Sequence, residues 1–397
     1  MKFSSRTTDL IHSPIGAAHS LLAHRVNDRP LLDLSQAAPA YPPAMVVQER
    51  IAAAAFEPSS ARYAPQPGLP ALRESFATDL SGAYAASVSA DDVLITAGCN
   101  QAFCVTINAL ASPGDSVLLA TPFYFNHEMW LKVEGIEPRH IANDQQLWPD
   151  LAHAEQLIDE STRAIVLVTP GNPTGITIPP ERLHQFALLA ERHDIALIID
   201  ETYRNFRPSH DPAHSLFPKS DPGETGRLGQ DWQDTVVSLH SFSKDLAIPG
   251  YRIGAVVAGQ AVRVEALKIL DCVAISAPWI GQEAAITGLR SATDWRVEQS
   301  QRVAKLQERF ENLMHSQPGG FELVSAGAYF GWVKAPPSTG ATTAAIVRSL
   351  VVEHDILVIP GTAFTPTDEL MLRFSFANLS GEQIDQLGER LNTWRNP

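Results

Sequence analysis

The chain has 397 residues, of which 45% are hydrophobic and 19% are charged. This composition predicts a globular protein with a large core, built as two or three domains or as one large and one small lobe. The 44 acidic residues outnumber the 30 basic ones and give a formal net charge of −14. That charge argues against nucleic acid and anionic membranes as partners, because both attract basic surfaces.

The amino terminus and the cysteines bear on the cellular compartment. The first ten residues, MKFSSRTTDL, lack the apolar core of a signal peptide. No stretch approaches the roughly 20 apolar residues that cross a bilayer. The three cysteines, Cys99, Cys104 and Cys272, are sparse and have no CxxC spacing. We therefore expect reduced, buried thiols in a cytoplasmic protein.

Short apolar runs alternate with helical stretches through the first two thirds of the chain. The helices in this part are expected at 99–111 and 180–193. Continuous apolar strands separated by helices are typical of a parallel sheet covered on both faces. The expected fold class is therefore α/β, with strands at 92–96, 116–120, 163–169, 195–200, 235–240 and 252–259.

Beyond residue 260 the pattern becomes helical, and 295–316 has the spacing of one long helix that leaves the first lobe. A smaller α+β lobe should follow, and the first 44 residues, rich in Pro and Ala, should pack against it. Its helices are expected at 341–353 and 381–395, and its strands at 321–324, 328–334, 356–361 and 370–377.

The segment 207–233 is polar and rich in proline, which predicts a long loop between two strands of the sheet. Its His210, Asp211 and His214 could be read as metal ligands, but a solvated loop is the ordinary interpretation. We expect no metal site.

The strands of a doubly wound sheet deliver their carboxyl ends to one shared crevice, so the residues after each strand are candidates for chemistry. PGNPTG (170–175) is a rigid turn that either positions the amide of Asn172 or is merely structural. Asp200 ends a buried strand and needs a cationic or hydrogen-bonding partner. Tyr203 can face the same pocket, although a buried structural aspartate would explain Asp200 equally well.

The stretch SLHSFSKDLAIPGYRIG (238–254) places Lys244 in a polar turn between two apolar runs. A lysine at the mouth of an apolar crevice is desolvated, so its pKa should fall. A neutral amine can form a Schiff base with a carbonyl group. Ser241, Ser243 and Arg252 would suit an anion such as a phosphate.

AGCNQAF (97–103) opens a helix with a glycine turn, so the backbone N–H groups of Cys99 and Asn100 are available to an anion. A phosphate cradle, an amine nucleophile, a carboxylate for a ring nitrogen, and a phenol with an amide for a ring hydroxyl together describe a site for pyridoxal 5′-phosphate (PLP).

With these residues in order, the chain resembles the class I/II aminotransferases, which are fold type I PLP enzymes of the aspartate aminotransferase kind. The resemblance covers nearly the whole chain and is carried by YAPQPGLPALR, ITAGCNQAF, TPFYF, VTPGNPTG, IDETY, SFSKDLAIPGYRIG and MLRFSFA. It implies a large PLP domain (45–290) with a mostly parallel seven-stranded sheet, a small α+β domain (1–44 and 291–397), and a homodimer with its sites at the interface.

The resemblance also assigns roles to single residues. Lys244 is implied as the Schiff-base lysine and Asp200 as the partner of the pyridine nitrogen, and Tyr203 and Asn172 as donors to the ring 3-oxygen. The phosphate site is implied to consist of Ser241, Ser243, Arg252 and the backbone of Cys99 and Asn100, with Tyr63 reaching it from the neighbouring subunit.

Tyr124 matches an aromatic residue that stacks on the cofactor ring, and Arg373 matches the clamp for the substrate carboxylate. Asn172 and Ala38 are also expected to contact the substrate. The chain departs from the family pattern at Ala37, where the N-terminal loop usually has glycine. It also has Asn100 where some relatives that use acidic substrates carry a basic residue, which argues mildly against a dicarboxylate specialist.

The implied activity is transfer of an amino group from an L-amino acid to a 2-oxo acid through Lys244. Apolar and aromatic residues expected near the pocket favour neutral or aromatic substrates: Tyr41, Phe123, Tyr124, Trp279, Tyr329 and Phe330. A PLP-dependent β-lyase, or another eliminating or decarboxylating enzyme of this fold, is the alternative within the class. A PLP-sensing transcription regulator would need an additional DNA-binding domain.

Overall fold

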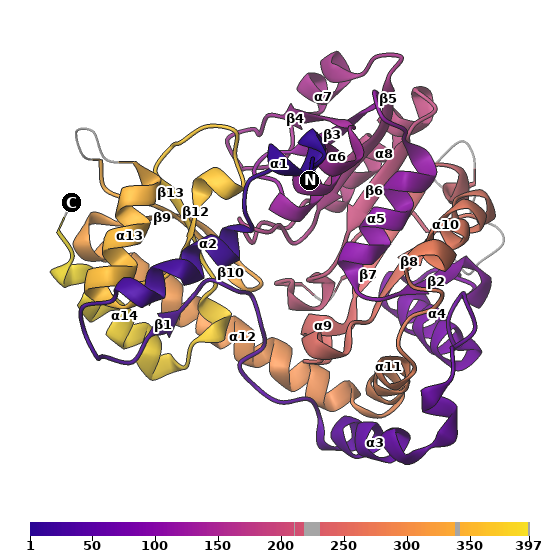
Figure 1. The fold of residues 1–397 in the computed structure, drawn as a ribbon, viewed down its shortest axis with the longest axis horizontal. Coiled ribbons are helices and arrows are strands. Elements are labelled where there is room, and N and C mark those ends of the chain that lie inside the picture. The colour runs from indigo at the N-terminus through magenta and orange to yellow at the C-terminus, as the bar shows by residue number, and fades with distance from the viewer. Residues whose placement is uncertain (210, 218–230, 338–341, 396–397) are drawn as a thin grey trace.

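A seven-stranded sheet forms the centre of the larger of two lobes in the computed structural model, which describes residues 1–209, 211–217, 231–337 and 342–395 (Figure 1). The strand β8 runs antiparallel to both of its neighbours, and all other neighbouring strands are parallel. The spatial order is β2 (Val93–Thr96), β8 (Gly254–Val257), β7 (Val236–Ser241), β6 (Ala196–Asp200), β5 (Thr162–Val168), β3 (Ser116–Ala120) and β4 (Glu137–Ile141).

The predicted α/β fold with a mostly parallel sheet is confirmed, and six of its strands were predicted individually. The seventh, β4, was missed because its sequence, EPRHI, is polar and contains Pro138. It lies at the edge of the sheet and pairs only with β3. Edge strands tolerate polar side chains and proline, so the apolar pattern that marks central strands is lacking there.

Helices cover both faces of this sheet because its side chains alternate between them. In β6, Leu197 and Ile199 belong to one core and Ile198 belongs to the other. The first core includes α4 (Pro70–Tyr84), α8 (Pro180–Arg192) and α11 (Trp279–Ser291), and the second includes α5 (Cys99–Leu110), α6 (Phe125–Glu134) and α10 (Gln260–Val273).

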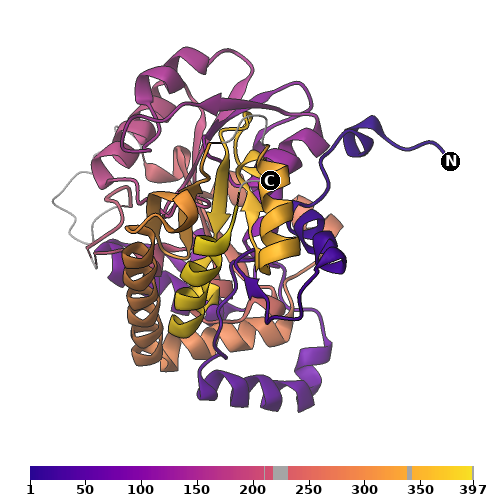
Figure 2. The ribbon, with the colours of Figure 1, turned by 90° about the vertical axis from the view of Figure 1, so that its left-hand side faces the viewer.

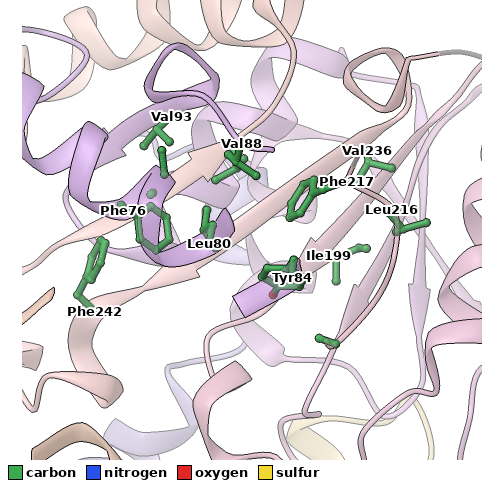
Figure 3. Packing of buried hydrophobic residues seen from close by; sticks show 14 of the residues in the cluster. Phe76, Leu80, Tyr84, Val88, Val93, Ile199, Leu216, Phe217, Val236 and Phe242 are labelled. Atoms are coloured by element: carbon green, nitrogen blue, oxygen red, sulfur yellow. The ribbon is translucent and has the colours of Figure 1, made fainter. Parts of the chain in front are cut away.

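Figure 3 shows part of the first core, where Phe76, Leu80 and Tyr84 of α4 lie among side chains of the sheet such as Ile199 and Val236. The large lobe also contains α3 (Met45–Phe56), which packs on α11, and α7 (Leu151–Leu157). None of the helices in the described ranges has the length and apolar character needed to cross a membrane.

The small lobe is built on a four-stranded antiparallel sheet in the order β12 (Ile359–Pro360), β13 (Met371–Phe374), β10 (Phe330–Lys334) and β9 (Glu322–Gly327). The long helix α12 (Thr293–Met314) leads into it from the large lobe, and α13 (Thr343–His354) and α14 (Gly381–Thr393) pack with it (Figure 1). The predicted strand 356–361 is in fact two short strands, β11 (Ile356–Leu357) and β12.

The N-terminal segment lies on the small lobe. Its strand β1 (Leu32–Asp33) pairs in parallel with β11, and the buried Asp355 binds Arg25 at 2.7 Å and Arg29 at 3.0 Å. The first residues extend away from the body of the molecule in Figure 2, and α1 (Ser5–Thr8), which follows them, contacts α6 of the large lobe. The helix α2 (Pro14–Ser20) then returns toward the boundary between the lobes.

The prediction of a solvated loop over 207–233 is wrong at His214. This residue is 1% exposed, its Nε2 lies 3.1 Å from Glu201 Oε1, and its ring packs on Tyr84. His210, the first of the three residues weighed as metal ligands, lies outside the described residues. Among the described ones, Asp211 and His214 belong to no group of three or more potential metal ligands.

Candidate active site

A cavity of about 410 Å³ lies at the carboxyl edge of the large sheet, facing the small lobe. Strands β2, β5, β6 and β7 end at this edge, and the antiparallel β8 begins there. The topology therefore brings together most of the residues predicted from the sequence. The predicted residues that line the cavity are Cys99, Asn100, Tyr124, Asn172, Asp200, Tyr203, Ser241, Ser243, Lys244, Arg252 and Arg373.

Lys244 lies in the short helix α9 (Phe242–Asp245), directly after β7. Its Nζ donates a hydrogen bond to the carbonyl oxygen of Ala37, in the N-terminal segment. Burial, and to a smaller extent the charges of Arg373 and Arg252, lower the pKa of Lys244 to about 8. Far more of this amine is therefore neutral near neutral pH than in an ordinary lysine, which favours its use as a nucleophile or base.

Asp200 is a buried carboxylate at the end of β6, with 4% of its surface exposed. Its Oδ1 accepts the N–H of Thr202 at 3.0 Å, and its Oδ2 lies 3.3 Å from Nε2 of His127. Burial alone would raise the pKa of Asp200, but hydrogen bonding to His127 and Thr202 outweighs it, and the pKa falls below its ordinary value. The cavity thus keeps a negative charge that could pair with a protonated ring nitrogen.

A ring of anion-binding groups lies around the first turn of α5. This helix begins after Gly98 without a side-chain cap, so its first N–H groups are free to bind an anion. A Cβ on Gly98 would lie 2.2 Å from Nη2 of Arg252, and one on Gly254 would lie 2.6 Å from the nitrogen of Cys99. Gly98 has a positive φ of 92°, which favours glycine, and Gly254 is needed because β8 lies directly against the backbone of the first turn of α5.

Two serines from the turn before Lys244 also belong to this group of anion-binding residues. Ser241 caps α9 by accepting the N–H of Ser243 at 3.2 Å, and both serines line the cavity. Two hydroxyl groups, a guanidinium group and a helix amino terminus together fit a phosphate group. The donor set of the structure therefore matches the phosphate end of the cofactor expected from the sequence.

Two tyrosines line the cavity between the cradle and the small lobe. Tyr203 is 4% exposed, and burial raises its pKa well above the ordinary value. Burial also raises the pKa of Tyr124 to about 12, and its hydroxyl accepts a hydrogen bond from Nδ2 of Asn126 at 2.9 Å. Both phenols therefore stay protonated at neutral pH and can act as hydrogen-bond donors.

Arg373 is 2% exposed on β13 of the small lobe and lies between the rings of Phe330 and Phe364, 5.1 Å and 5.0 Å from their centroids. Its Nη1 donates to Oδ1 of Asn172 at 2.9 Å, and its Nη2 donates to the carbonyl of Ser35. None of the ion pairs among the described residues involves Arg373, and its Nε has no hydrogen-bond partner. A buried guanidinium group that lines the cavity and has no carboxylate partner among the described residues favours an anion beside it.

A buried ionic network lies behind the two turns that carry Tyr203 and Lys244. Asp79 binds Arg204 and also Arg296, the latter at 2.8 Å, and Arg296 binds Asp245 at 2.7 Å. Burial opposes ionisation of Asp79, but the two arginines hold its pKa well below the ordinary range. The network ties the residues that follow Tyr203 and Lys244 to the first turn of α12.

Sequence reasoning missed several residues at the cavity. His127, whose ring stacks on Phe103 at 4.0 Å, is 73 positions from Asp200, and no local motif links the two. Besides Ala37, eight other residues line the cavity without having been assigned a role. Ser13, Ile15 and Gln36 come from the N-terminal segment, and the others lie close in sequence to predicted residues: Phe125, Asn126, Val168, Thr202 and Pro249. The N-terminal contribution depends on a long-range return of the chain that no pattern announces.

Other predicted residues lie elsewhere. Ala38 does not line the cavity; its N–H donates to Oδ1 of Asn378 at 3.1 Å, and Ala37 lines the cavity instead. Tyr63 is 76% exposed and is likewise absent from the lining. Of the aromatic residues expected near the pocket, only Tyr124 lines it, and the others do not: Tyr41, Phe123, Trp279, Tyr329 and Phe330.

Comparison with known proteins agrees with this geometry. The profile of the family described as "Aminotransferase class I and II" matches residues 29–391. The chain is 28% identical over 398 residues to an aromatic aminotransferase of Arabidopsis thaliana, covering 98% of this chain and 95% of the relative. It is 28% identical over 352 residues to a valine–pyruvate aminotransferase of Mycobacterium tuberculosis, covering 86% of each.

A solved aspartate aminotransferase of Thermus thermophilus, a single mutant, superposes with a TM-score of 0.84 at 23% identity and covers 99% of each chain. At that identity the likeness establishes the fold, and the family match establishes the kind of enzyme. The chain belongs to the class I and II aminotransferases.

Proposed function

We propose that this aminotransferase moves the amino group of a neutral or aromatic L-amino acid to a 2-oxo acid. The observation that carries the proposal is Arg373, a buried guanidinium group that lines the cavity and has no carboxylate partner among the described residues. Among the described residues that line the cavity, the other two cations are Lys244 and Arg252, and both belong to the expected cofactor site. Among the described residues, the cavity therefore has no additional cation that could bind a second carboxylate on the side chain of a substrate.

The apolar part of the lining supports the choice of substrate. Ile15, Tyr124, Phe125 and Val168 line the cavity and offer contacts to an uncharged side chain. Two relatives are named for aromatic amino acids and for valine, but others at the same identity are named for aspartate and for arginine, so the choice rests on the lining of the cavity.

The enzymes of this family use pyridoxal 5′-phosphate. When bound, this cofactor supplies an aldehyde that captures the amino group and a ring that accepts electrons from Cα. We propose that Lys244 holds the aldehyde and then, once displaced, moves the proton of Cα, since its lowered pKa near 8 suits a base at neutral pH. Arg373 and Asn172 orient the carboxylate, which aligns the Cα–H bond.

The remaining residues hold the cofactor in this proposal. Asp200 keeps the ring nitrogen protonated because its carboxylate is ionised and buried. Tyr203 and Asn172 would donate to the ring oxygen, and Tyr124 would contact the ring. Ser241, Ser243, Arg252 and the N–H groups of Cys99 and Asn100 bind the phosphate. We place the cofactor domain at 45–290 and the small domain at 1–44 and 291–397.

Substitution of Arg373 by lysine tests the carboxylate clamp. A lysine keeps the charge but loses the planar fork, so we expect KM for both amino acid and oxo acid to rise by at least about 10-fold and kcat to fall as well. A neutral amine without a carboxylate should react almost as before. Steady-state kinetics on both kinds of substrate, with Arg309→Lys at an exposed small-lobe position as the control, would measure this split.

The products separate transamination from elimination. We expect a 2-oxo acid and the aminated cofactor, without release of ammonia. If Arg373→Lys reacts with amino acids as the parent enzyme does, the clamp must be sought at another residue. If ammonia and pyruvate form instead, the enzyme is a lyase.

We also propose a homodimer in which Tyr63 serves the neighbouring site, because its exposed side chain does not line its own cavity. Tyr63→Phe should weaken retention of the cofactor. When Tyr63→Phe chains are mixed with Lys244→Ala chains, each hybrid gathers both lesions in one site and leaves the other site intact, so activity should return. Native mass spectrometry would verify the exchange; hybrids without recovered activity would show that Tyr63 works within its own chain.

A further inference from the structure

The turn that carries Asn172 touches the small lobe through the backbones of two glycines. A Cβ on Gly175 would lie 2.3 Å from the nitrogen of Gly327 and 2.5 Å from its oxygen. A Cβ on Gly327 would lie 2.2 Å from the oxygen of Gly175. These separations are below any van der Waals contact, so neither position accepts a side chain unless the lobes move apart.

A side-chain hydrogen bond reinforces this contact. Ser325, two residues before Gly327 on β9, is buried and donates from its Oγ to the carbonyl of Thr174 at 2.8 Å. Thr174 and Gly175 belong to the turn of Asn172, which is closed by the N–H of Gly175 donating to Gly171 at 2.8 Å. The small lobe is therefore seated directly on the turn.

The contact between β9 and this turn is linked to Arg373 through the small sheet. Gly327 on β9 pairs with Phe330 on β10, and Trp332 on β10 pairs with Arg373 on β13. The position of β9 relative to the turn thus determines the position of Arg373 relative to Asn172. Nη1 of Arg373 and Oδ1 of Asn172 are 2.9 Å apart.

We infer that Gly327 and Ser325 are positioning residues for substrate carboxylate binding. By holding β9 against the turn, they place the guanidinium group of Arg373 at the cavity, with its Nη1 bound to Asn172. The inference rests on the proposed role of Arg373. A displacement of about 1 Å in such a constellation is enough to change rates by roughly 10²-fold.

The test compares Gly327→Ala and Ser325→Ala with Gly82→Ala, a matched control on α4 where a Cβ would meet nothing within 4 Å. The backbone of Gly327 does not have a positive φ, so alanine is strained there only by the contact. The probe is 3-phenylpropanoate, a carboxylate that cannot react, titrated calorimetrically into the holoenzyme. Reactivity toward an amino acid and toward a neutral amine, the visible spectrum and urea unfolding are measured in parallel.

We expect Gly327→Ala to weaken binding of 3-phenylpropanoate by at least about 10-fold, and Ser325→Ala to weaken it less, because only one hydrogen bond is lost. Reactivity with the amine, the spectrum and the control variant should stay as in the parent. If Gly327→Ala does not fold, the affinity of Ser325→Ala for 3-phenylpropanoate decides whether the inference holds.

Unchanged carboxylate affinity in the folded variants, or an equal loss of reactivity toward amine and amino acid, would overturn the inference and leave the contact a matter of packing. Arg373→Lys keeps the two proposals apart. If that variant also binds the carboxylate normally, the clamp itself is misassigned. If it binds weakly while Gly327→Ala and Ser325→Ala bind normally, only the positioning role is wrong.

Discussion

Lys244→Ala should abolish transamination, with kcat reduced by at least about 10³-fold, because one amine serves both as the nucleophile that holds the cofactor and as the base that moves the Cα proton. The structure places this amine at the cavity, where burial lowers its pKa to about 8. Alanine cannot replace either action. The cofactor should then bind only non-covalently, through the phosphate cradle.

Borohydride reduction followed by peptide mass spectrometry provides the decisive measurement. The parent enzyme should yield the cofactor fixed to the peptide that contains Lys244, and Lys244→Ala should yield none. Lys268→Ala is a suitable control because that lysine is exposed on α10 and pairs only with Glu265, at 2.7 Å. Cofactor fixed to another lysine in Lys244→Ala would refute the assignment.

Asp200→Asn should bind the cofactor yet lower kcat by roughly 10²-fold or more, equivalent to about 2.7 kcal/mol of barrier. The pKa of Asp200 lies below its ordinary value, so the carboxylate is ionised at neutral pH and the substitution removes a real charge. The carboxamide can still accept the N–H of Thr202, so the turn after β6 should stay in place. What is lost is the charge that keeps a ring nitrogen protonated.

Kinetics and cofactor titration of Asp200→Asn can be compared with Asp92→Asn. Asp92 is also a buried carboxylate, 9% exposed, but it accepts the N–H of Ser89 and lies outside the cavity. The control should retain activity even if its stability falls. Near-full activity in Asp200→Asn would show that the buried carboxylate is structural.

Much of the site could be predicted because its residues follow strands. Continuous apolar runs mark the central strands, and parallel strands bring their carboxyl ends to one edge. Asn172, Asp200 and Lys244 lie within a few residues of such ends, so local pattern and topology suffice to place them in one crevice. The strand β4 lacked this signal because an edge strand has no need of an apolar run.

Contacts between distant elements were beyond the reach of local pattern. The pairing of His127 with Asp200, of Arg373 with Asn172, and of Lys244 with the carbonyl of Ala37 joins segments 73, 201 and 207 residues apart, respectively.

The amino-acid sequence by itself determined the mostly parallel sheet and the family, and it predicted residues that the structure brings to one cavity, because short motifs and side-chain periodicity encode these features locally. The tertiary structure alone decided which partner each charged group meets. That choice depends on how helices and lobes pack: burial removes water from Asp200 and Arg373, and only groups brought within about 3 Å can then compensate them.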